Sequence, residues 1–401
     1  MLTRLRMLTA GESHGPKLTG ILEGIPAGLE IDFEGADELL ARRQRGYGAG
    51  GRMKIERDRL HLTGGYMQGA TTGGPLCFEI VNRDWSNWRD RDVAPMNRPR
   101  PGHADLTGAI KYGYGDLRLS LERSSARETA MRVAAGAICI QLLETLGVSI
   151  GGWVRALGGV DIAACDVGLA DVSVLREQLE HARSDEMAAP ISGQRERLRA
   201  EVKRAMKAKD TLGGLIEVVA LGLPAGLGSY VQWDRRLDAR IAGAILSIQA
   251  MKGVEIGEAF TNCRRDGTEV HDEIIRDQEG EIGRRSNRAG GVEGGITTAQ
   301  PLWLRVAMKP ISTTLNPRQT VDLVTGQPSD TQYERSDICA LPRAVPICES
   351  MLALVLADAL LEKLGGDSLA EVKQRLDSLR RSHLDDLKMN NESWRIGYQE
   401  R

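Results

Sequence analysis

The sequence lacks the features that mark secreted, membrane-bound and metal-dependent proteins. No run of about 18 uncharged apolar residues occurs, which is the length that a membrane-spanning helix requires. The N-terminal segment contains no apolar stretch of the kind found in a signal peptide. The six cysteines never form a Cys-x-x-Cys pair, and most lie in apolar surroundings. We therefore expect a cytoplasmic protein without disulfides, without a structural zinc or other metal, and without a membrane segment.

Several common catalytic motifs are also missing. The chain has no Gly-x-Ser-x-Gly elbow, no His-Glu-x-x-His helix and no P-loop, so hydrolase and kinase interpretations lack a motif. Residues 46–51 do satisfy Gly-x-Gly-x-x-Gly, but they follow a helical segment and precede a strand-like one. A dinucleotide fingerprint instead follows a strand and opens a helix. We interpret residues 46–51 as a flexible basic loop that can approach an anion; a solvated basic helix end is the alternative.

Charge and aromatic content argue against a nucleic-acid partner. Aromatic residues make up only 4% of the chain and the formal net charge is -2. A near-neutral chain without interleaved aromatic and basic residues is not typical of a nucleic-acid binder. The basic residues are nevertheless unbalanced, with 42 arginines against 11 lysines. Because the guanidinium group recognises phosphate and carboxylate through paired hydrogen bonds, this excess favours an anionic small ligand, although ordinary surface usage explains most of it.

The apolar pattern predicts a mixed fold with a large core. Apolar residues make up 41% of the 401 residues. Segments with helical spacing alternate with strand-like runs, which places the chain in the α+β (α/β-like) class. We predict helices over 34–44, 127–146, 172–183, 196–207, 234–251, 347–364 and 369–387, and strands over 18–23, 76–81, 215–221 and 303–308.

A weak internal repeat indicates a duplicated unit. The segment Gly-Ile-Pro-Ala-Gly at 24–28 recurs as Gly-Leu-Pro-Ala-Gly at 222–226, and 69–76 resembles 295–302. Coincidence among abundant glycines is the alternative. We expect one domain over 1–401, with pseudo-repeat halves at roughly 1–150 and 210–365 and a helical tail over 366–401. We interpret the polar stretch 264–288 as a mobile excursion that folds over the site.

Two kinds of segment combine residues suited to anion binding and proton transfer. In Arg-Ser-Ser-Ala-Arg-Glu-Thr at 123–129, Ser125 and Glu128 fit a capping box that starts a helix and directs free N–H groups toward an anion. An ordinary cap with surface arginines is the alternative. His14 and His103 differ from the other four histidines because both lie beside glycines at junctions between elements. There an imidazole can meet a ligand and titrate near neutral pH.

Three blocks together resemble the chorismate synthase family. They are Gly-Glu-Ser-His-Gly at 11–15, the 123–129 segment, and Arg-Ser-Asp-Ile-Cys-Ala-Leu-Pro-Arg at 335–343. The resemblance implies a β-α-β sandwich, a homotetramer and reduced FMN as the cofactor. It also implies conversion of 5-enolpyruvylshikimate 3-phosphate to chorismate by 1,4-elimination of phosphate, with no net redox change.

The resemblance further implies which residues form the site. His14 would lie by the substrate phosphate and His103 by the flavin N1/C2 carbonyl edge, while Asp337 would assist proton transfer around flavin N5. The implied substrate-binding residues are Ser13, Arg43, Arg52 and Arg127. The implied FMN-binding residues are Arg123, Ser124, Ser125, Gln249, Ala250, Gly294, Lys309, Pro310, Ile311, Ser312, Thr313 and Arg335.

One position departs from the family pattern, and two other functions stay open. Ala49 stands in the loop 46–51 where the family usually has arginine. Three explanations stay open: the change weakens binding of the substrate or cofactor, another arginine such as Arg45 compensates for it, or the chain is an altered form. The alternative among enzymes is a flavin reductase or other FMN oxidoreductase, and outside enzymes an RNA- or polyanion-binding protein. Reduction of the flavin by NADPH is not decided by the sequence.

Overall fold

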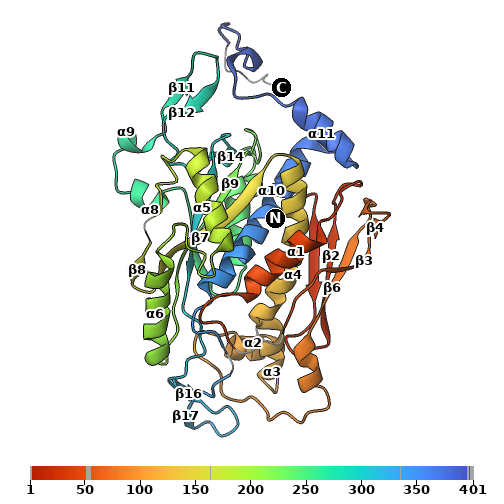
Figure 1. Ribbon diagram of the computed structural model, residues 1–401, viewed down its shortest axis with the longest axis vertical. Helices are drawn as coiled ribbons and strands as arrows, with labels where there is room; N and C mark the ends of the chain where they lie inside the picture. Colours follow the sequence, from red (N-terminus) through yellow and green to blue (C-terminus); the bar gives the residue numbers. More distant parts are fainter. Residues whose placement is uncertain (1, 51–55, 163, 335, 395–396, 398–401) are drawn as a thin grey trace.

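Two antiparallel sheets enclose a layer of helices (Figure 1). The computed structural model describes residues 2–50, 56–162, 164–334, 336–394 and 397. The first sheet contains, in spatial order, β1 (Arg6–Ala10), β2 (Lys17–Glu23), β6 (Leu76–Val81) and β3 (His61–Gly64). The second contains β10 (Met251–Ile256), β15 (Leu302–Met308), β9 (Gly214–Leu221), β7 (Ser149–Leu157) and β8 (Val160–Asp161). Helices α4 (Thr129–Thr145) and α10 (Leu341–Leu364) lie between the sheets, which confirms the expected α+β class and β-α-β sandwich.

The first sheet packs inward through alternating apolar residues. In β6, Leu76, Phe78 and Ile80 are buried, whereas the residues between them are more exposed. The residue opposite Phe78 on β2 is Gly20, where a Cβ atom would lie 2.6 Å from the aromatic ring. Glycine at this position therefore makes room for the ring in the core.

Helix α10 forms the centre of the helical layer. It is long and apolar enough to cross a membrane, but its most apolar window is entirely buried inside the protein, as in a core helix. It packs against α4 at Gly136, where a Cβ atom would lie 2.2 Å from that of Ser350. The two helices can therefore approach closely only because this residue is glycine.

Further helices flank the central pair or cover the second sheet. Helices α1 (Phe33–Gln44) and α7 (Leu237–Leu246) pack beside α10. Helix α5 (Val172–Ser184) packs on β7, where its leucines meet the buried Trp153 and Trp303. Helix α6 (Arg195–Lys207) lies beside β8. Helices α2 (Asp105–Tyr112) and α3 (Arg118–Ser124) lie at one end of the sandwich, near the hairpin of β16 (Gln319–Val321) and β17 (Pro328–Asp330) (Figure 1).

The structure supports the internal repeat. The elements β1, β2, α1, β3, β4 (Tyr66–Met67), β5 (Ala70–Thr71), β6 and α4 have counterparts in the same order in β7, β9, α7, β10, β13 (Val292–Glu293), β14 (Ile296–Thr297), β15 and α10. The Thr71 hydroxyl donates to the Pro26 carbonyl and accepts from the Leu29 N–H. Thr297 makes the same two bonds, with Pro224 and Leu227. The boundaries of the two halves stay a prediction.

Most predicted elements are present, some with shifted ends. Helices α1, α5 and α6 and all four predicted strands agree with the prediction to within one residue at each end. The helix predicted over 127–146 divides into a 3-10 turn (Ala126–Glu128) and α4. That predicted over 234–251 is reduced to α7, because Arg236 is extended and Met251 pairs with the second sheet. Helix α10 begins six residues earlier than expected.

The excursion and the tail differ from the prediction. The tail contains α11 (Leu369–Asp377) and a 3-10 turn (Leu384–Asp386) rather than one helix to residue 387. Residues 264–288 contain a short helix and the hairpin of β11 (Ile274–Arg276) and β12 (Ile282–Arg284). The N–H of Ile282 donates to the Ser382 carbonyl, and that of Leu384 to Gly280, so the hairpin pairs with the tail. Both lie at the opposite end of the molecule from α2, and the prediction that the excursion folds over the site is wrong (Figure 1).

The cysteines play no part in cross-linking. All six are free thiols, and Cys139, Cys339 and Cys348 are buried. Burial raises the pKa of Cys339 to about 12, so this thiol stays protonated at neutral pH. Within the described ranges, no group of three or more His, Cys, Asp or Glu side chains is arranged to hold a metal ion.

Candidate active site

Two adjoining cavities lie at the end of the sandwich that carries α2 and α3. The first, which we call the apolar cavity, has a volume of about 380 Å³ and apolar walls formed by Ile248, Met251, Met308 and Ile347. The second, the polar cavity, has a volume of about 240 Å³ and is lined mainly by polar and charged side chains. Six residues line both cavities: Arg43, His103, Ala126, Ile311, Asp337 and Arg343.

His14 enters the polar cavity from the tight turn after β1. The turn starts at Gly11, whose φ is +107° and where a Cβ atom would lie 2.6 Å from the Lys17 carbonyl oxygen, so glycine is required. Nδ1 of His14 lies 2.6 Å from Oε1 of Glu122, and the His14 backbone N–H donates to Oε2 over 2.7 Å. The Trp88 ring packs against the imidazole with centroids 4.0 Å apart. The imidazole is therefore held at its Nδ1 edge and on one face.

Glu122 determines which nitrogen of His14 is free. Burial raises the pKa of Glu122, but the hydrogen bonds from His14 and the charge of Arg118 outweigh burial, and the pKa lies below its usual value. An ionised carboxylate only accepts hydrogen bonds, so we assign the hydrogen of this contact to Nδ1. Nε2 is then the nitrogen available to a ligand.

His103 borders both cavities just before α2. Its Nδ1 lies 2.6 Å from Oδ1 of Asp105, a completely buried residue. Arg100 donates to the other oxygen, Oδ2, from its backbone N–H over 3.0 Å and from Nε over 2.8 Å. Burial raises the pKa of Asp105, yet the hydrogen bonds from Arg100 and His103 hold it far below its usual value. Asp105 thus joins an arginine and a histidine into one charged unit.

The 123–129 segment starts a helix without forming a capping box. The Ser125 hydroxyl caps the turn by accepting from the Arg127 N–H over 3.3 Å, whereas a capping box would use the N–H of Glu128. The Glu128 carboxylate instead accepts from Arg132, at 3.0 Å, and from the amide of Gln249. Because Arg132 lies one helical turn later and competes for the carboxylate, the reciprocal bond does not form, and the predicted capping box is wrong.

The arginines of the polar cavity each have a carboxylate behind them. Nη1 of Arg127 donates to both oxygens of Asp58 over 2.7 Å, and Nε donates to Asn82 over 2.8 Å. Arg43 shares Asp58 at 3.4 Å. Such pairs offset the desolvation of buried cations and fix their position. Nη2 of Arg127 is buried and has no hydrogen-bond partner in the described part of the chain.

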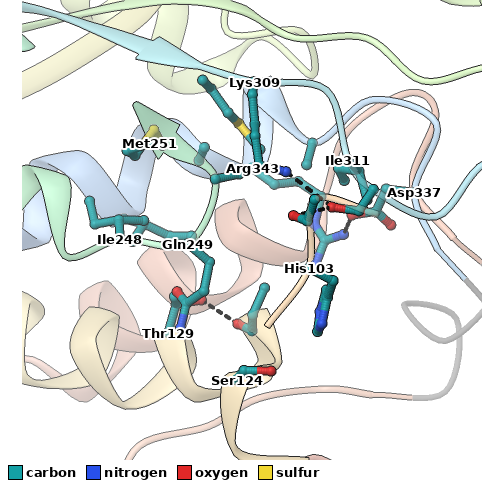
Figure 2. Close-up of a pocket in the computed structure, with 18 of the residues that line it drawn as sticks. His103, Ser124, Thr129, Ile248, Gln249, Met251, Lys309, Ile311, Asp337 and Arg343 are labelled. Carbon is teal, nitrogen blue, oxygen red and sulfur yellow. Dashed lines mark hydrogen bonds and ion pairs between the residues drawn. The ribbon is translucent and has the colours of Figure 1, made fainter. Parts of the chain in front are cut away.

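Asp337 lies where the two cavities meet. Its Oδ1 accepts from the Gly50 N–H over 2.7 Å, and its Oδ2 pairs with Arg343 of α10 (Figure 2). The next residue, Ile338, donates its N–H to the Gly48 carbonyl. Asp337 therefore ties the glycine-rich loop to the first turn of α10.

Two polar atoms in the wall of the apolar cavity lack partners. Oγ of Ser124 and Oε1 of Gln249 are buried and accept no hydrogen bond from any described residue. The amide nitrogen of Gln249 already donates to Glu128 over 3.3 Å. Lys309 contributes a cation to the same wall, and burial together with Lys252 lowers its pKa. The wall is suited to a ligand with an apolar body and a hydrogen-bonding edge.

Most of the residues expected from the sequence line these cavities. Those at the apolar cavity are Arg43, His103, Ser124, Gln249, Ala250, Lys309, Ile311, Ser312 and Asp337. Those at the polar cavity are Ser13, His14, Arg43, His103, Ser125, Arg127, Ile311, Thr313 and Asp337. Arg52 and Arg335 lie outside the described residues.

Three expected FMN-binding residues are not among the lining residues of either cavity. Arg123 is exposed and donates to the Thr9 carbonyl over 2.9 Å. Pro310 lies between two lining residues. Gly294 lies in the turn between β13 and β14, at the far end of β15 from Met308. Because that strand spans about 20 Å, Gly294 of this chain is remote from the apolar cavity.

The groups that hold the two histidines belong to none of the sequence motifs that identified the site. Asp105 follows His103 by two residues, so this local contact could have been found from the spacing. Glu122 immediately precedes the 123–129 segment, but it reaches the first histidine only through the tertiary fold. Trp88, which packs against the His14 ring, belongs to no motif in the sequence.

Comparison with known proteins places the chain in a family. The profile of the chorismate synthase family matches residues 5–361. The chorismate synthase of Geobacter sulfurreducens is 49% identical over 389 residues, covering 93% of this chain and 98% of the relative. That of Aquifex aeolicus is 49% identical over 387 residues, covering 94% and 97%. A crystal structure of a chorismate synthase matches with a TM-score of 0.78 and 42% identity, covering 94% of this chain and 97% of the other. The chain belongs to the chorismate synthase family.

Proposed function

We propose that the paired cavities are where this chain performs the reaction of its family, the conversion of 5-enolpyruvylshikimate 3-phosphate to chorismate. The chain is a phosphate-eliminating lyase, and its family uses reduced FMN. The observation that carries the proposal is the meeting of His14 and His103, far apart in the sequence, at one polar cavity with Nδ1 of each fixed by a carboxylate. We assign the substrate to the polar cavity and FMN to the apolar cavity beside it.

The polar cavity suits the anionic groups of the substrate. The substrate carries a phosphate and two carboxylates, and Arg43, Arg100, Arg127 and Arg343 line the cavity. Guanidinium groups match these anions geometrically, and each hydrogen bond to a charged group contributes about 1.5–3 kcal/mol. Nη2 of Arg127 lies 3.9 Å from Glu56 but makes no hydrogen bond to a described residue, so it is one donor that a substrate oxygen would satisfy.

The residues of the apolar cavity fit FMN. A flavin ring needs apolar walls and hydrogen-bond partners along its pyrimidine edge. Ile248, Met251 and Ile347 supply the walls, while Ser124 and Gln249 hold the buried polar atoms that such an edge would satisfy. When bound, reduced FMN supplies the transient electron donation that lets phosphate leave although the C6 hydrogen is poorly acidic.

The three expected catalytic residues take different places around the ligands. We assign His14 to donate a proton to the leaving phosphate through Nε2, because Glu122 occupies Nδ1. His103 borders both cavities, and we assign it to hydrogen-bond the N1/C2 carbonyl edge of FMN. Asp337 also borders both, and we assign it to proton transfer near flavin N5.

Anaerobic turnover tests this proposal. Protein, substrate and reduced FMN should together release chorismate and inorganic phosphate in equal amounts, and omission of reduced FMN should abolish both products. NADPH oxidation coupled to FMN reduction, with no chorismate formed, would instead favour the flavin reductase alternative. RNA binding that weakens steeply with salt, without turnover, would favour a polyanion-binding protein.

We also propose a homotetramer, as the family resemblance implies, and a cytoplasmic location. Light scattering should give roughly four times the chain mass of 43.7 kDa. Fractionation of the source cells should recover the protein with the cytoplasmic fraction.

Alanine substitutions at Ser124 and Ser125 should separate the two ligand sites. Ser124 lines the apolar cavity, whereas Ser125, which the family resemblance assigned to FMN, lines the polar cavity alone. Ser124→Ala should weaken FMN binding about 2- to 10-fold, the effect of one hydrogen bond, and leave substrate affinity unchanged. Ser125→Ala should weaken substrate binding instead and lower the free energy of unfolding by about 1 kcal/mol, because it removes the cap. Spectral titration and urea unfolding measure these effects; weaker FMN binding in Ser125→Ala would move that residue to the cofactor side.

Ala49→Arg should strengthen substrate binding by about one to two powers of ten. Ala49 precedes Gly50, which lines the polar cavity, so an arginine here adds a charged donor worth roughly 1.5–3 kcal/mol. Arg45, the residue that follows α1, pairs with Glu38 at 2.6 Å, with both side chains about half exposed, and it lines neither cavity among the described residues.

The dissociation constant of the substrate at low and high salt is the measurement for Ala49→Arg. The gain should shrink at high salt, because part of it is long-range attraction. Ala49→Gln is the uncharged control and should change affinity little. Equal constants for Ala49→Arg and the unaltered chain would mean that another group already fills this role.

A further inference from the structure

Glu122 of α3 hydrogen-bonds the turn that carries His14 and holds it in place. The His14 backbone N–H and ring Nδ1 each contact a different oxygen of the Glu122 carboxylate, at 2.7 and 2.6 Å. The Ser13 N–H donates to the Glu122 carbonyl over 3.1 Å. A single glutamate thus fixes the backbone and the ring of the same histidine, which leaves the imidazole little freedom to rotate.

Trp88 restrains the same ring from its face. The two rings are 4.0 Å apart at an interplanar angle of 37°. The indole N–H of Trp88 donates over 3.1 Å to Asp84, which is buried, so the indole is itself anchored. Held at one edge and one face, the imidazole of His14 presents its remaining edge, with Nε2, to the polar cavity that it lines.

Glu122 has fewer hydrogen-bond partners than Asp105, the carboxylate that binds His103. Asp105 is shared, because Arg100 donates to it from three positions. The side chain of Glu122 hydrogen-bonds only to His14 within the described part of the chain. Its charge is therefore directed to this one imidazole.

We propose that Glu122 is a positioning residue for the elimination: it makes Nε2 the working nitrogen of His14 and stabilises the imidazolium that faces the substrate phosphate. The proposal rests on the proposed function above. The proton on Nε2 passes to a phosphate oxygen as the carbon–oxygen bond at C3 breaks and its electron pair leaves with phosphate. His14 is then neutral, with Nδ1–H still bonded to Glu122. Glu122 touches no reacting atom and acts through His14.

Other charged groups border the Trp88 ring or the polar cavity. Arg91 and Arg118 lie over the Trp88 ring at 5.5 and 6.0 Å from its centroid. Arg127 and Glu334 line the same cavity. Among the described residues, Glu122 is therefore the carboxylate that contacts the His14 imidazole directly and balances the charge of an imidazolium.

Glu122→Gln, with Glu79→Gln as the matched control, tests the proposal. Glu79 pairs with Lys17 on the first sheet and lies outside both cavities among the described residues. Glu122→Gln should lower turnover about 10- to 100-fold without changing FMN affinity. Glu79→Gln should leave both unchanged. In the unaltered chain, ¹⁵N NMR of His14 should show hydrogen on Nδ1 across the neutral range.

The outcomes separate this proposal from the proposed function. Normal turnover in Glu122→Gln, with His14→Ala impaired, would overturn the positioning role alone. Normal turnover in His14→Ala would remove His14 from the reaction, and the positioning role with it. If Glu122→Gln fails to fold, judged by circular dichroism and loss of FMN binding, the NMR measurement still decides. A neutral His14 with hydrogen on Nε2 would overturn the proposal.

Discussion

Alanine in place of His14 or His103 is expected to lower turnover by about 10²–10⁴-fold, the usual contribution of a positioned acid or base. The side chains are 18% and 23% exposed, so truncation removes little core packing and the fold should persist. The two variants should differ in ligand binding. His14→Ala should weaken substrate binding and leave FMN affinity unchanged, because His14 lines only the polar cavity. His103 borders both cavities, so His103→Ala should weaken the binding of both ligands.

Single-turnover kinetics with saturating reduced FMN under anaerobic conditions measure these effects. His61→Ala is the control, because His61 is an exposed residue of β3 and should leave the rate unchanged. Circular dichroism confirms that each variant is folded. Near-normal turnover in either variant would remove that histidine from the mechanism, whatever its place in the structure.

The sequence pattern predicted an element correctly where its structure depends on residues close together in the chain. In β6, the alternation of Leu76, Phe78 and Ile80 gave the strand its observed bounds. The first six residues of α10 were missed because Pro346 lies inside the helix and lowers its propensity, whereas Pro342 lies in the first turn, where proline is tolerated. Burial of nearly the whole helix outweighs the cost of Pro346. The hairpin of residues 264–288 was misplaced because its partner near residue 382 lies about 100 residues away and has no local signal.

The motifs located the cavities but not the charge pairs behind them. Arg43 and Arg127 were recognised, whereas Asp58, which binds both, belongs to no motif. A buried arginine requires a carboxylate within hydrogen-bond distance, but which carboxylate supplies it depends on the tertiary fold. Glu122 illustrates the same limit, because its contact with His14 spans 108 positions.

Asp105→Ala is expected to lower the free energy of unfolding by about 3–5 kcal/mol at neutral pH, the usual effect of breaking a buried ion pair. The side chain is completely buried and accepts from Arg100 over 2.8 and 2.9 Å and from His103 over 2.6 Å. Its removal leaves Arg100 buried without a carboxylate, with the Thr313 hydroxyl at 3.1 Å and the His103 ring at 3.2 Å as its side-chain neighbours among the described residues. Asp161→Asn is the control, because Asp161 is 86% exposed, and it should change stability by less than about 0.5 kcal/mol.

The stability difference between the unaltered chain and Asp105→Asn should also depend on pH in a defined direction. The hydrogen bonds from Arg100 and His103 overcome burial and hold the folded-state pKa of Asp105 far below its unfolded value of about 3.9. A depressed carboxylate pKa stabilises the folded state fully above the unfolded pKa, and this contribution is lost as pH falls toward the folded pKa. Urea unfolding should therefore give a constant difference from about pH 8 to 5 and a smaller one below about pH 4. A difference that grows as the solution is acidified would show that Asp105 is not the ionised partner of Arg100, and His103 would then lack the charged anchor that its place between the two cavities requires.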